Sequence, residues 1–418
     1  MEHEMAVKAR TGIFLGVAGL TVAAIAATVV VNVVQNSSGD EDVVTWWVPD
    51  WDYQTAVDLV AEFERQHPDI SVELVQTTGD TVANRTSVAL DSGNVPDVIT
   101  ESIARVRGYA DKGQLADLSG LFGEDIPADD FAPGLVDSLT IDGATYAMPY
   151  RWATNALIYN PELFEAAGIE EPPATWDEFV EDARALTSGD AVGTAWPVQG
   201  DPSDLTLRFL EFAVSGGATI NGDGIPELTE ESSRAAVEMI GGAIAEGWAS
   251  PSSFELDNTG IRELFLQGRV AMYPGGVFDV DEAQAQGAPV ATAPLPGPEG
   301  PGTGLGVGWA YVVPEASSHQ DDAAELVRFL ARPESMAELT LTFPARTSAS
   351  EDARFQTPER VAYAGQLAEH SVPAPNDPRW TASIQPVHDQ IQEVALGRET
   401  PAEAAANIQR IVDQAFAE

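Results

Sequence analysis

The chain has 418 residues, enough for two domains with apolar cores, and its hydrophobic fraction of 44% is typical of a globular protein. It carries 66 acidic and 21 basic residues, a formal net charge of −45, which argues against nucleic acid as a partner because the phosphate backbone would be repelled. Self-repulsion on this scale is tolerated best where salt screens it, so we expect a salt-adapted protein with an acidic, halophilic-type surface. Cysteine is absent, which excludes disulfides, thiolate nucleophiles, thiolate metal ligands and a lipid-bearing cysteine.

Residues 1–35 are expected to direct the chain to the membrane. Lys8 and Arg10 precede an uncharged apolar run at 12–34. This run exceeds the about 7–15 residues of a signal-peptide core and matches the about 20 needed to cross a bilayer. The length favours an uncleaved anchor with its amino end inside, and the alternative is a signal peptide cleaved near Ala26. A polar linker at 36–42 follows, and in both cases the remaining chain is extracellular.

From residue 43 onward, strand and helix patterns alternate. Strands are expected at 43–48, 71–76 and 97–100, separated by a helix that ends at His67 and by a polar helix through 88–90. This alternation predicts a mostly parallel sheet with helices on both faces. Later helices are expected at 230–246, 260–266, 321–331 and 401–416, and 294–304 is expected to be a surface loop rich in proline and glycine.

Residues 141–187 contain two helix starts with explicit capping signals. Asn160 precedes Pro161, and Gly168 follows the apolar run, which predicts a short capped helix. Thr175 and Glu178 have the spacing of a capping box, so a second helix should begin there.

This segment, IDGATYAMPYRWATNALIYNPELFEAAGIEEPPATWDEFVEDARALT, resembles the hinge-proximal part of the maltose-binding-protein-like sugar-binding components of ABC importers, extracellular solute-binding protein family 1. Other stretches resemble the same family in the same order, at 63–75, 96–118, 264–276, 306–330 and 384–416. The resemblance implies an α/β fold of the periplasmic-binding-protein-like type II, in which two α/β lobes are joined by a hinge and enclose a ligand cleft.

By this analogy, lobe 1 comprises 43–152 and 294–330, and lobe 2 comprises 153–293 and 331–418. The crossings between lobes would lie near 151–155, 290–294 and 331–334. The resemblance also implies a monomer that binds a carbohydrate, most plausibly an oligosaccharide, and delivers it to the transmembrane permease subunits of an ABC transporter. It implies no catalytic residue and no cofactor.

Sugar recognition requires aromatic rings against the C–H faces of the sugar and carboxylates, amides or arginines for its hydroxyls. Tryptophans near strand ends or at the expected crossings are therefore the first candidates, together with polar residues beside them. Glu101, Trp196, Gly276, Phe278 and Trp380 are chosen because they match positions where the resembled family contacts its ligand. Phe278 stands where that family usually has tryptophan. The expected ligand residues are Trp47, Trp51, Asp52, Glu101, Arg151, Trp152, Asn155, Trp196, Gly276, Phe278, Trp309, Arg346 and Trp380.

Each candidate has a simpler structural alternative. Alternation along the first strand should turn Trp46 and Trp47 to opposite faces, so one of them can belong to the core. Arg151 could form an interlobe ion pair, and Glu101 could be a solvated carboxylate. If Arg151 and Arg346 both face the cleft, an acidic sugar is expected; otherwise a neutral oligosaccharide is favoured.

Other chemistry has weak support in the sequence. The histidines have no zinc-ligand spacing, so no metal site is expected. The glycine run before Trp309, GTGLGVGW, lacks the Lys-Ser/Thr of a phosphate loop. The alternatives to a transport component are a glycosidase or lyase using two cleft carboxylates, and a sugar sensor with the same fold.

Overall fold

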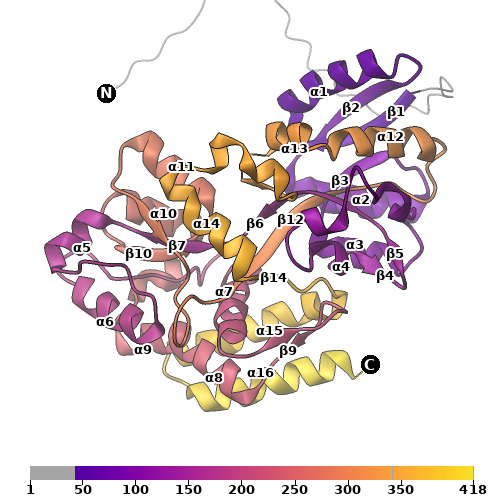
Figure 1. Ribbon diagram of the computed structural model, residues 1–418. Helices are drawn as coiled ribbons and strands as arrows, with labels where there is room; N and C mark the ends of the chain where they lie inside the picture. The colour runs from indigo at the N-terminus through magenta and orange to yellow at the C-terminus, as the bar shows by residue number, and fades with distance from the viewer. Residues whose placement is uncertain (1–42, 341, 418) are drawn as a thin grey trace, which may run out of the picture. The chain divides into compact units, whose positions relative to one another are not determined.

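The computed structural model describes residues 43–340 and 342–417 (Figure 1). The apolar run at 12–34, interpreted above as an anchor or signal peptide, and the linker at 36–42 lie outside these residues. Within the described ranges, no helix combines the length and the apolar character needed to cross a bilayer.

The larger sheet has the strand order β13-β6-β12-β3-β1-β2, and β14 pairs with the start of β12. Its strands are β1 (Val43–Pro49), β2 (Ser71–Thr77), β3 (Val98–Ser102), β6 (Met148–Ala153), β12 (Gly304–Val312), β13 (Phe343–Pro344) and β14 (Ser371–Pro373).

The sheet is mixed, and the prediction of a mostly parallel sheet is correct for the first three strands and for the short pairing of β14 with β12. β1 runs parallel to β2 and β3, whereas β12 is antiparallel to both β3 and β6, and β13 is antiparallel to β6. Apolar alternation identifies a strand but carries no information about the direction of its neighbours. The later strands enter the sheet after long excursions of the chain, so local sequence could not fix their direction.

The second sheet is antiparallel, with the order β10-β7-β11, and consists of β10 (Met272–Gly275), β7 (Ala156–Tyr159) and β11 (Ala291–Ala293). Only Thr154 and Asn155 separate β6 of the first sheet from β7 of the second. The chain therefore changes sheets within the segment predicted to be the first crossing. Between β11 and β12 it returns to the first sheet.

Helices cover these sheets, and their bounds follow the capping signals closely. The helices are α1 (Tyr53–Gln66), α2 (Gly79–Ser92), α3 (Ile103–Ala110), α4 (Leu135–Ser138), α5 (Pro161–Ala167), α6 (Trp176–Leu186), α7 (Pro202–Ser215), α8 (Glu230–Val237), α9 (Ala243–Glu246), α10 (Asn258–Leu266), α11 (Val277–Gln286), α12 (Gln320–Leu330), α13 (Pro333–Leu339), α14 (Pro358–Glu369), α15 (Pro378–Ala395) and α16 (Pro401–Phe416). Two short hairpins, β4 (Thr140–Ile141) with β5 (Ala144–Thr145) and β8 (Thr219–Ile220) with β9 (Pro226–Glu227), complete the elements used below.

The predicted caps of α5 and α6 are confirmed, and α16 has a capping box of the same kind. The Asn160 side chain accepts hydrogen bonds from the Glu162 and Leu163 amides at the start of α5. Thr175 and Thr400 each form a capping box with the glutamate three residues later. These caps satisfy the free amide groups of each first turn, and no ligand is needed to explain them.

The predicted helix at 230–246 is interrupted by a π-helical turn, Glu238–Gly242, between α8 and α9. A Cβ on Gly241 would lie 2.9 Å from the Ile391 carbonyl oxygen, so this glycine allows close packing of the turn against α15. α16 packs against both α8 and α15 beneath the second sheet (Figure 1).

The proline- and glycine-rich segment at 294–304 is a loop, but the prediction that it lies on the surface is wrong for much of its length. Leu295, Pro296, Gly297 and Gly302 are buried. Gln366 of α14 explains this burial: its side chain accepts a hydrogen bond from the Leu295 amide and donates to the carbonyl oxygens of Gly302 and His370.

Candidate functional site

Trp51, Asp52, Arg151 and Trp309 form a contact group, defined here as the Trp51–Trp309 group. Trp51 and Asp52 follow the carboxyl end of β1, and Arg151 lies on β6. Trp309 lies on β12. In the sheet it is opposite Arg151 of β6 on one side and opposite Ser102, the last residue of β3, on the other. The sheet order therefore gathers side chains that are far apart in sequence at the carboxyl ends of β1 and β3, where α/β proteins commonly bind ligands.

The aromatic part of the group is the contact between the two indoles. The ring centroids of Trp51 and Trp309 are 5.0 Å apart in an edge-to-face arrangement. The guanidinium carbon of Arg151 lies 5.6 Å from the Trp51 ring centroid, within cation–π range. Both tryptophans are partly exposed, as a ring that receives a ligand must be.

Asp52 supplies the charged part of the group. It is 2% exposed, accepts a hydrogen bond of 2.5 Å from the Tyr150 hydroxyl through Oδ2, and presents Oδ1 3.8 Å from Nη1 of Arg151. Burial raises the pKa of the Asp52 carboxyl to about 6, although the Arg151 charge and the Tyr150 hydrogen bond oppose the rise.

Several polar atoms of the group have no hydrogen-bond partner in the protein. They are Nε1 of Trp51, Oδ1 of Asp52 and Nη1 of Arg151, all of them buried. These atoms interact with one another more weakly than in a full hydrogen bond: Oδ1 and Nη1 lie 3.8 Å apart as an ion pair, and the Trp51 indole acts to lower the pKa of the Asp52 carboxyl. Unpaired buried polar groups are costly, and they cluster where a ligand or water completes the bonding. Together they provide two donors and one acceptor beside two aromatic rings, which is the combination expected for a polyhydroxylated ligand.

Two further expected residues lie on strands beside the group. Glu101 of β3 is fully buried, and its Oε1 accepts bonds from Arg105 and from the Ser102 amide, while Oε2 is unpaired. The alternative of a solvated carboxylate is therefore wrong. Trp47 is partly exposed, whereas Trp46 is 1% exposed, so the two alternate as predicted; the Arg85 guanidinium lies 4.4 Å from the Trp47 ring centroid.

Asn155 sits where the chain changes sheets. It is 8% exposed and donates a hydrogen bond of 2.6 Å from Nδ2 to Oε1 of Glu211 on α7. Glu211 also accepts a bond of 3.0 Å from Nη1 of Arg208, and both of these charged residues are buried. The network ties the crossing to the helix behind the second sheet.

Gly276 and Phe278 form the start of α11. Gly276 is the N-cap, and its amide donates to Oδ2 of Asp279. A Cβ on Gly276 would lie 2.4 Å from the Phe278 ring, so the glycine allows this ring to fold back over the helix start. Phe278 is 55% exposed, so its ring is accessible as a stacking surface.

The remaining expected residues are engaged with the protein itself. Trp152, Trp196 and Trp380 are at most 4% exposed and belong to the apolar cores. Arg346 uses its guanidinium on the Asp130 carboxylate and on the carbonyl oxygens of Ala331 and Asp125. Arg346 therefore does not join Arg151 in the Trp51–Trp309 group.

The glycine run at 302–308 serves packing in the structure. A Cβ on Gly306 would lie 1.9 Å from Cζ2 of Trp152, and one on Gly308 would lie 2.8 Å from its Cε3. From Gly304 onward the run is part of β12, and Gly306 and Gly308 leave a slot for the Trp152 ring, so no phosphate ligand is needed to explain them. Sequence analysis missed Tyr150, although it is an aromatic residue beside the predicted Arg151.

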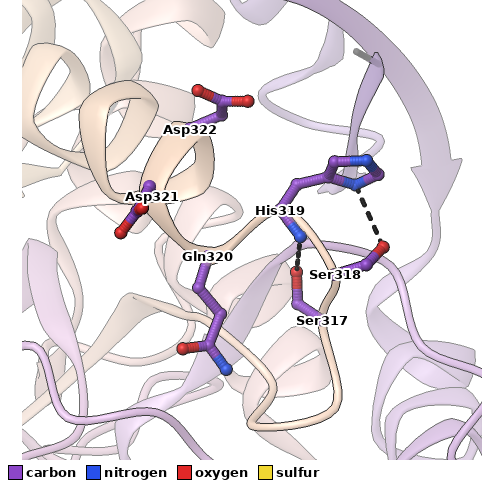
Figure 2. Close-up of a pocket in the computed structure, with 6 residues that line it drawn as sticks. All are labelled: Ser317, Ser318, His319, Gln320, Asp321 and Asp322. Atoms are coloured by element: carbon purple, nitrogen blue, oxygen red, sulfur yellow. Dashed lines mark hydrogen bonds between the residues drawn. The ribbon is translucent and has the colours of Figure 1, made fainter. Parts of the chain in front are cut away.

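A separate surface hollow lies at the start of α12 and is lined by residues 317–322 (Figure 2). The His319 amide donates to Oγ of Ser317, and the Asp97 carboxylate accepts from the Ser317 hydroxyl, contacts the His319 ring and accepts from the Thr45 amide. Ser317, His319 and Asp97 thus bond to one another. The described residues contain no side-chain group suited to a metal ion, at this hollow or elsewhere.

Comparisons of the sequence with known proteins agree on one family. Residues 51–337 match the family described as bacterial extracellular solute-binding protein. An uncharacterized lipoprotein of Streptomyces antibioticus is 30% identical over 364 residues, covering 81% of this chain and 78% of the relative. A lactose-binding protein of Rhizobium radiobacter is 25% identical over 306 residues, covering 68% and 69%.

Solved structures agree on the fold. The sugar-binding protein MalE of Xanthomonas citri superposes with a TM-score of 0.80 at 23% identity, covering 90% of this chain and 97% of that one. The GacH receptor of Streptomyces glaucescens gives a TM-score of 0.74 at 23% identity, covering 90% and 99%. The fold is therefore the type II periplasmic-binding-protein fold that the sequence resemblance implied.

Proposed function

Because this chain belongs to the bacterial extracellular solute-binding proteins, we propose that it binds a carbohydrate outside the cell and delivers it to the permease subunits of an ABC transporter. Relatives named for lactose, diacetylchitobiose and mannitol binding support a sugar as the solute. The observation that carries the proposal is the Trp51–Trp309 group, in which the loosely paired Asp52 and Arg151 lie beside two partly exposed indoles.

The charges of the group favour a neutral sugar over an acidic one. The positive charge of Arg151 is balanced by Asp52 at 3.8 Å, and Arg346 is held by Asp130. A sugar carboxylate would enter beside the buried Asp52, and the described Trp51–Trp309 group has no second cation to compensate it. A neutral hydroxyl can instead donate to Oδ1 of Asp52 and accept from Nη1 of Arg151.

The ligand cleft is proposed to lie between two lobes built on the two sheets, with crossings at 154–155 and 294–303. A third crossing near 331–334 has less support, because β13 pairs with β6 and α13 packs against α1, both on the first sheet's side. We therefore propose a later third crossing, between Pro344 of β13 and the start of α14. Trp47, Glu101, Asn155, Gly276 and Phe278 are proposed as further cleft residues.

The export route is proposed from the sequence. The apolar run at 12–34 would act as an uncleaved anchor, or as a signal peptide cleaved near Ala26. The lipoprotein relative raises the question of a lipid anchor, but this chain has no cysteine to carry one. We propose that the protein acts as a monomer, without catalytic activity of its own.

Calorimetric titration with neutral mono-, di- and trisaccharides, and with uronic acids as the acidic counterparts, tests the function and the ligand class together. We expect saturable binding of a neutral sugar, no binding of uronic acids, and no product after prolonged incubation. Binding of none of these sugars would remove the proposal, and turnover of any of them would favour a glycosidase or lyase. Neighbouring permease genes would distinguish an importer from a sensor.

Substitution W309A tests the site itself. Loss of a stacking indole should weaken sugar binding by about 1–3 kcal/mol, the range of energetically dominant contact residues. W176A is a matched control, because Trp176 is also partly exposed but lies on α6, where its indole nitrogen bonds the Pro296 carbonyl. Equal affinities of W309A and the unmodified protein would exclude the Trp51–Trp309 group as the binding site.

A further inference from the structure

The tip of the hairpin formed by β8 and β9 is a rigid turn. Oδ1 of Asn221 accepts hydrogen bonds from the amides of Asp223 at 3.0 Å and Ile225 at 3.2 Å. Gly224 has φ of 69°, the left-handed conformation that completes such a turn. The turn thereby holds the Asp223 side chain, which is 69% exposed, away from the hairpin.

This turn contacts elements from the opposite lobe of the proposed arrangement. Nη2 of Arg107, on α3, donates a hydrogen bond of 3.2 Å to Oδ1 of Asp223. The Arg107 side chain is only 17% exposed, so it is held in place more firmly than a surface arginine usually is. Arg107 lies in the segment 43–152 and Asp223 in 153–293, the two principal parts of the proposed lobes.

A second contact lies beside the first. A Cβ on Gly224 would lie 2.0 Å from Oδ1 of Asn376, so the glycine allows the turn to press directly on that side chain. Nδ2 of Asn376 donates a hydrogen bond of 2.9 Å to the carbonyl oxygen of Ser138, at the end of α4 in the first lobe. The hairpin tip therefore packs against Asn376, and Asn376 in turn bonds the end of α4.

The charges around the contact are nearly balanced, which is unusual in this protein. Arg107 also lies 3.8 Å from Asp111, and Arg379 forms an ion pair with Asp377 at 2.7 Å. Hydrogen bonding to Asp377, with added attraction from Asp111 and Asp223, raises the pKa of the Arg379 guanidinium above its ordinary value. In a chain with a net charge of −45, two segments this acidic would repel each other without the two arginines.

We propose that Arg107 on α3 and Asp223 at the tip of the β8–β9 hairpin form a charged latch that holds the two lobes closed, an inference that rests on the proposed two-lobe arrangement. The latch exists only in the closed conformation, so it shifts the equilibrium between open and closed lobes. Because the pair is partly exposed, salt screens it, and lobe closure becomes dependent on ionic strength.

The absence of cysteine allows a direct measurement on the ligand-free protein. V88C and L396C introduce two labelling sites, one on α2 and one at the end of α15, at positions 68% and 46% exposed. Pulsed electron paramagnetic resonance between the attached spin labels then reports the separation of the proposed lobes. Salt also screens the repulsion between the two acidic lobes, so the latch is read from the difference between the unmodified protein and R107Q. We expect the unmodified protein to have the larger short-distance population at about 0.01 M salt, where the Debye length is about 30 Å, and the difference to disappear at about 1 M, where it is about 3 Å.

Substitutions R107Q and D223N should each reduce the ratio of closed to open protein at low salt by about two- to fivefold, the range of an exposed ion pair. The double variant R107Q/D223N should show no further reduction, because both changes break one interaction. R234Q is the control, since Arg234 pairs with Glu238 within a single helical stretch and bridges no lobes.

Three results would overturn the latch: a single long distance in the unmodified sequence at low salt, unchanged distances in R107Q and D223N, or an effect of R234Q equal to theirs. The sugar titration is independent of this measurement. A latch that responds to salt in a protein that binds no sugar would contradict the transport function alone, and sugar binding without a latch effect would contradict the latch alone.

Discussion

At the scale of single residues, the Trp51–Trp309 group could be predicted in composition but not in geometry. Tryptophans near strand ends and an arginine at the first crossing were identifiable from sequence, because those residue types suit sugar recognition. The partner of Arg151 was not, since Asp52 lies about a hundred positions earlier and meets it only through the sheet order. The same limit applies to Arg346, because its partner Asp130 is even more remote, 216 positions earlier in the sequence.

Asp52 should make sugar binding dependent on pH. Its pKa is raised to about 6, so acidification below that value neutralises the carboxylate that pairs with Arg151 and accepts a sugar hydroxyl. We expect affinity to fall between about pH 7.5 and about pH 5 in calorimetric titrations, and D52N to bind weakly at both values. D182N is the control, because Asp182 on α6 also has a pKa raised to about 6 but lies outside the group. If D182N removed the pH dependence of sugar affinity and D52N did not, Asp52 could not have this role.

Protonation of Asp52 should weaken sugar binding but stabilise the folded protein. Between about pH 4 and about pH 6 the folded protein holds a proton on Asp52 that the unfolded chain releases, so the contribution of this group to the unfolding free energy falls as the pH rises. Urea unfolding of D52N across this range should show a shallower decline than the unmodified protein. An identical slope in both proteins would indicate that the carboxyl is not titrating there.

The slot for Trp152 makes Gly306 sensitive to substitution. G306A would place a Cβ 1.9 Å from a buried indole that cannot move aside, so we expect a loss of about 1–3 kcal/mol in the unfolding free energy, as for other overpacked cores. G365A is the matched control: Gly365 lies in α14 with open space around its Cβ position, and alanine there should stabilise by about 0.5–1 kcal/mol. Equal stability of the two variants would contradict the packing argument.

At the scale of elements, helix starts with capping signals and the first three strands could be predicted, whereas the pairing of the later strands could not. Capping boxes and proline or glycine boundaries act within a few residues, so the starts of α6 and α16 follow from sequence directly. The antiparallel entry of β12 and the pairing of β13 depend on long-range contacts. The π-helical turn before α9 has the same origin, since it arises from packing against α15.

Gln366 is the side chain that fixes the loop returning from the second sheet to the first. Q366L would leave the Leu295 amide and the Gly302 carbonyl without partners in a buried position, and we expect the unfolding free energy to fall by about 1–3 kcal/mol. Q385L should have little effect, because Gln385 on α15 bonds Asp389 at an exposed position, where water can replace the lost bond. Urea unfolding monitored by far-ultraviolet circular dichroism measures both; equal losses would show that Gln366 is not a specific constraint.

At the scale of the whole molecule, the net charge of −45 determines how the protein responds to its solvent. Like charges spread over one folded chain destabilise the compact state, and ions reduce that repulsion. We expect the thermal midpoint to rise steadily from about 0.05 M to about 1 M salt, with NaCl and KCl giving the same gain. A midpoint that is constant across the series would contradict the interpretation of a salt-adapted surface.

The contact between Trp51 and Trp309 has an optical consequence. Two indoles held 5.0 Å apart at a steep angle couple their electronic transitions, which gives a paired signal in the near-ultraviolet circular dichroism spectrum. A sugar ring seated against either indole would change that coupling without any label being attached. The same two side chains proposed to hold the ligand therefore also provide an intrinsic spectroscopic signal of its arrival.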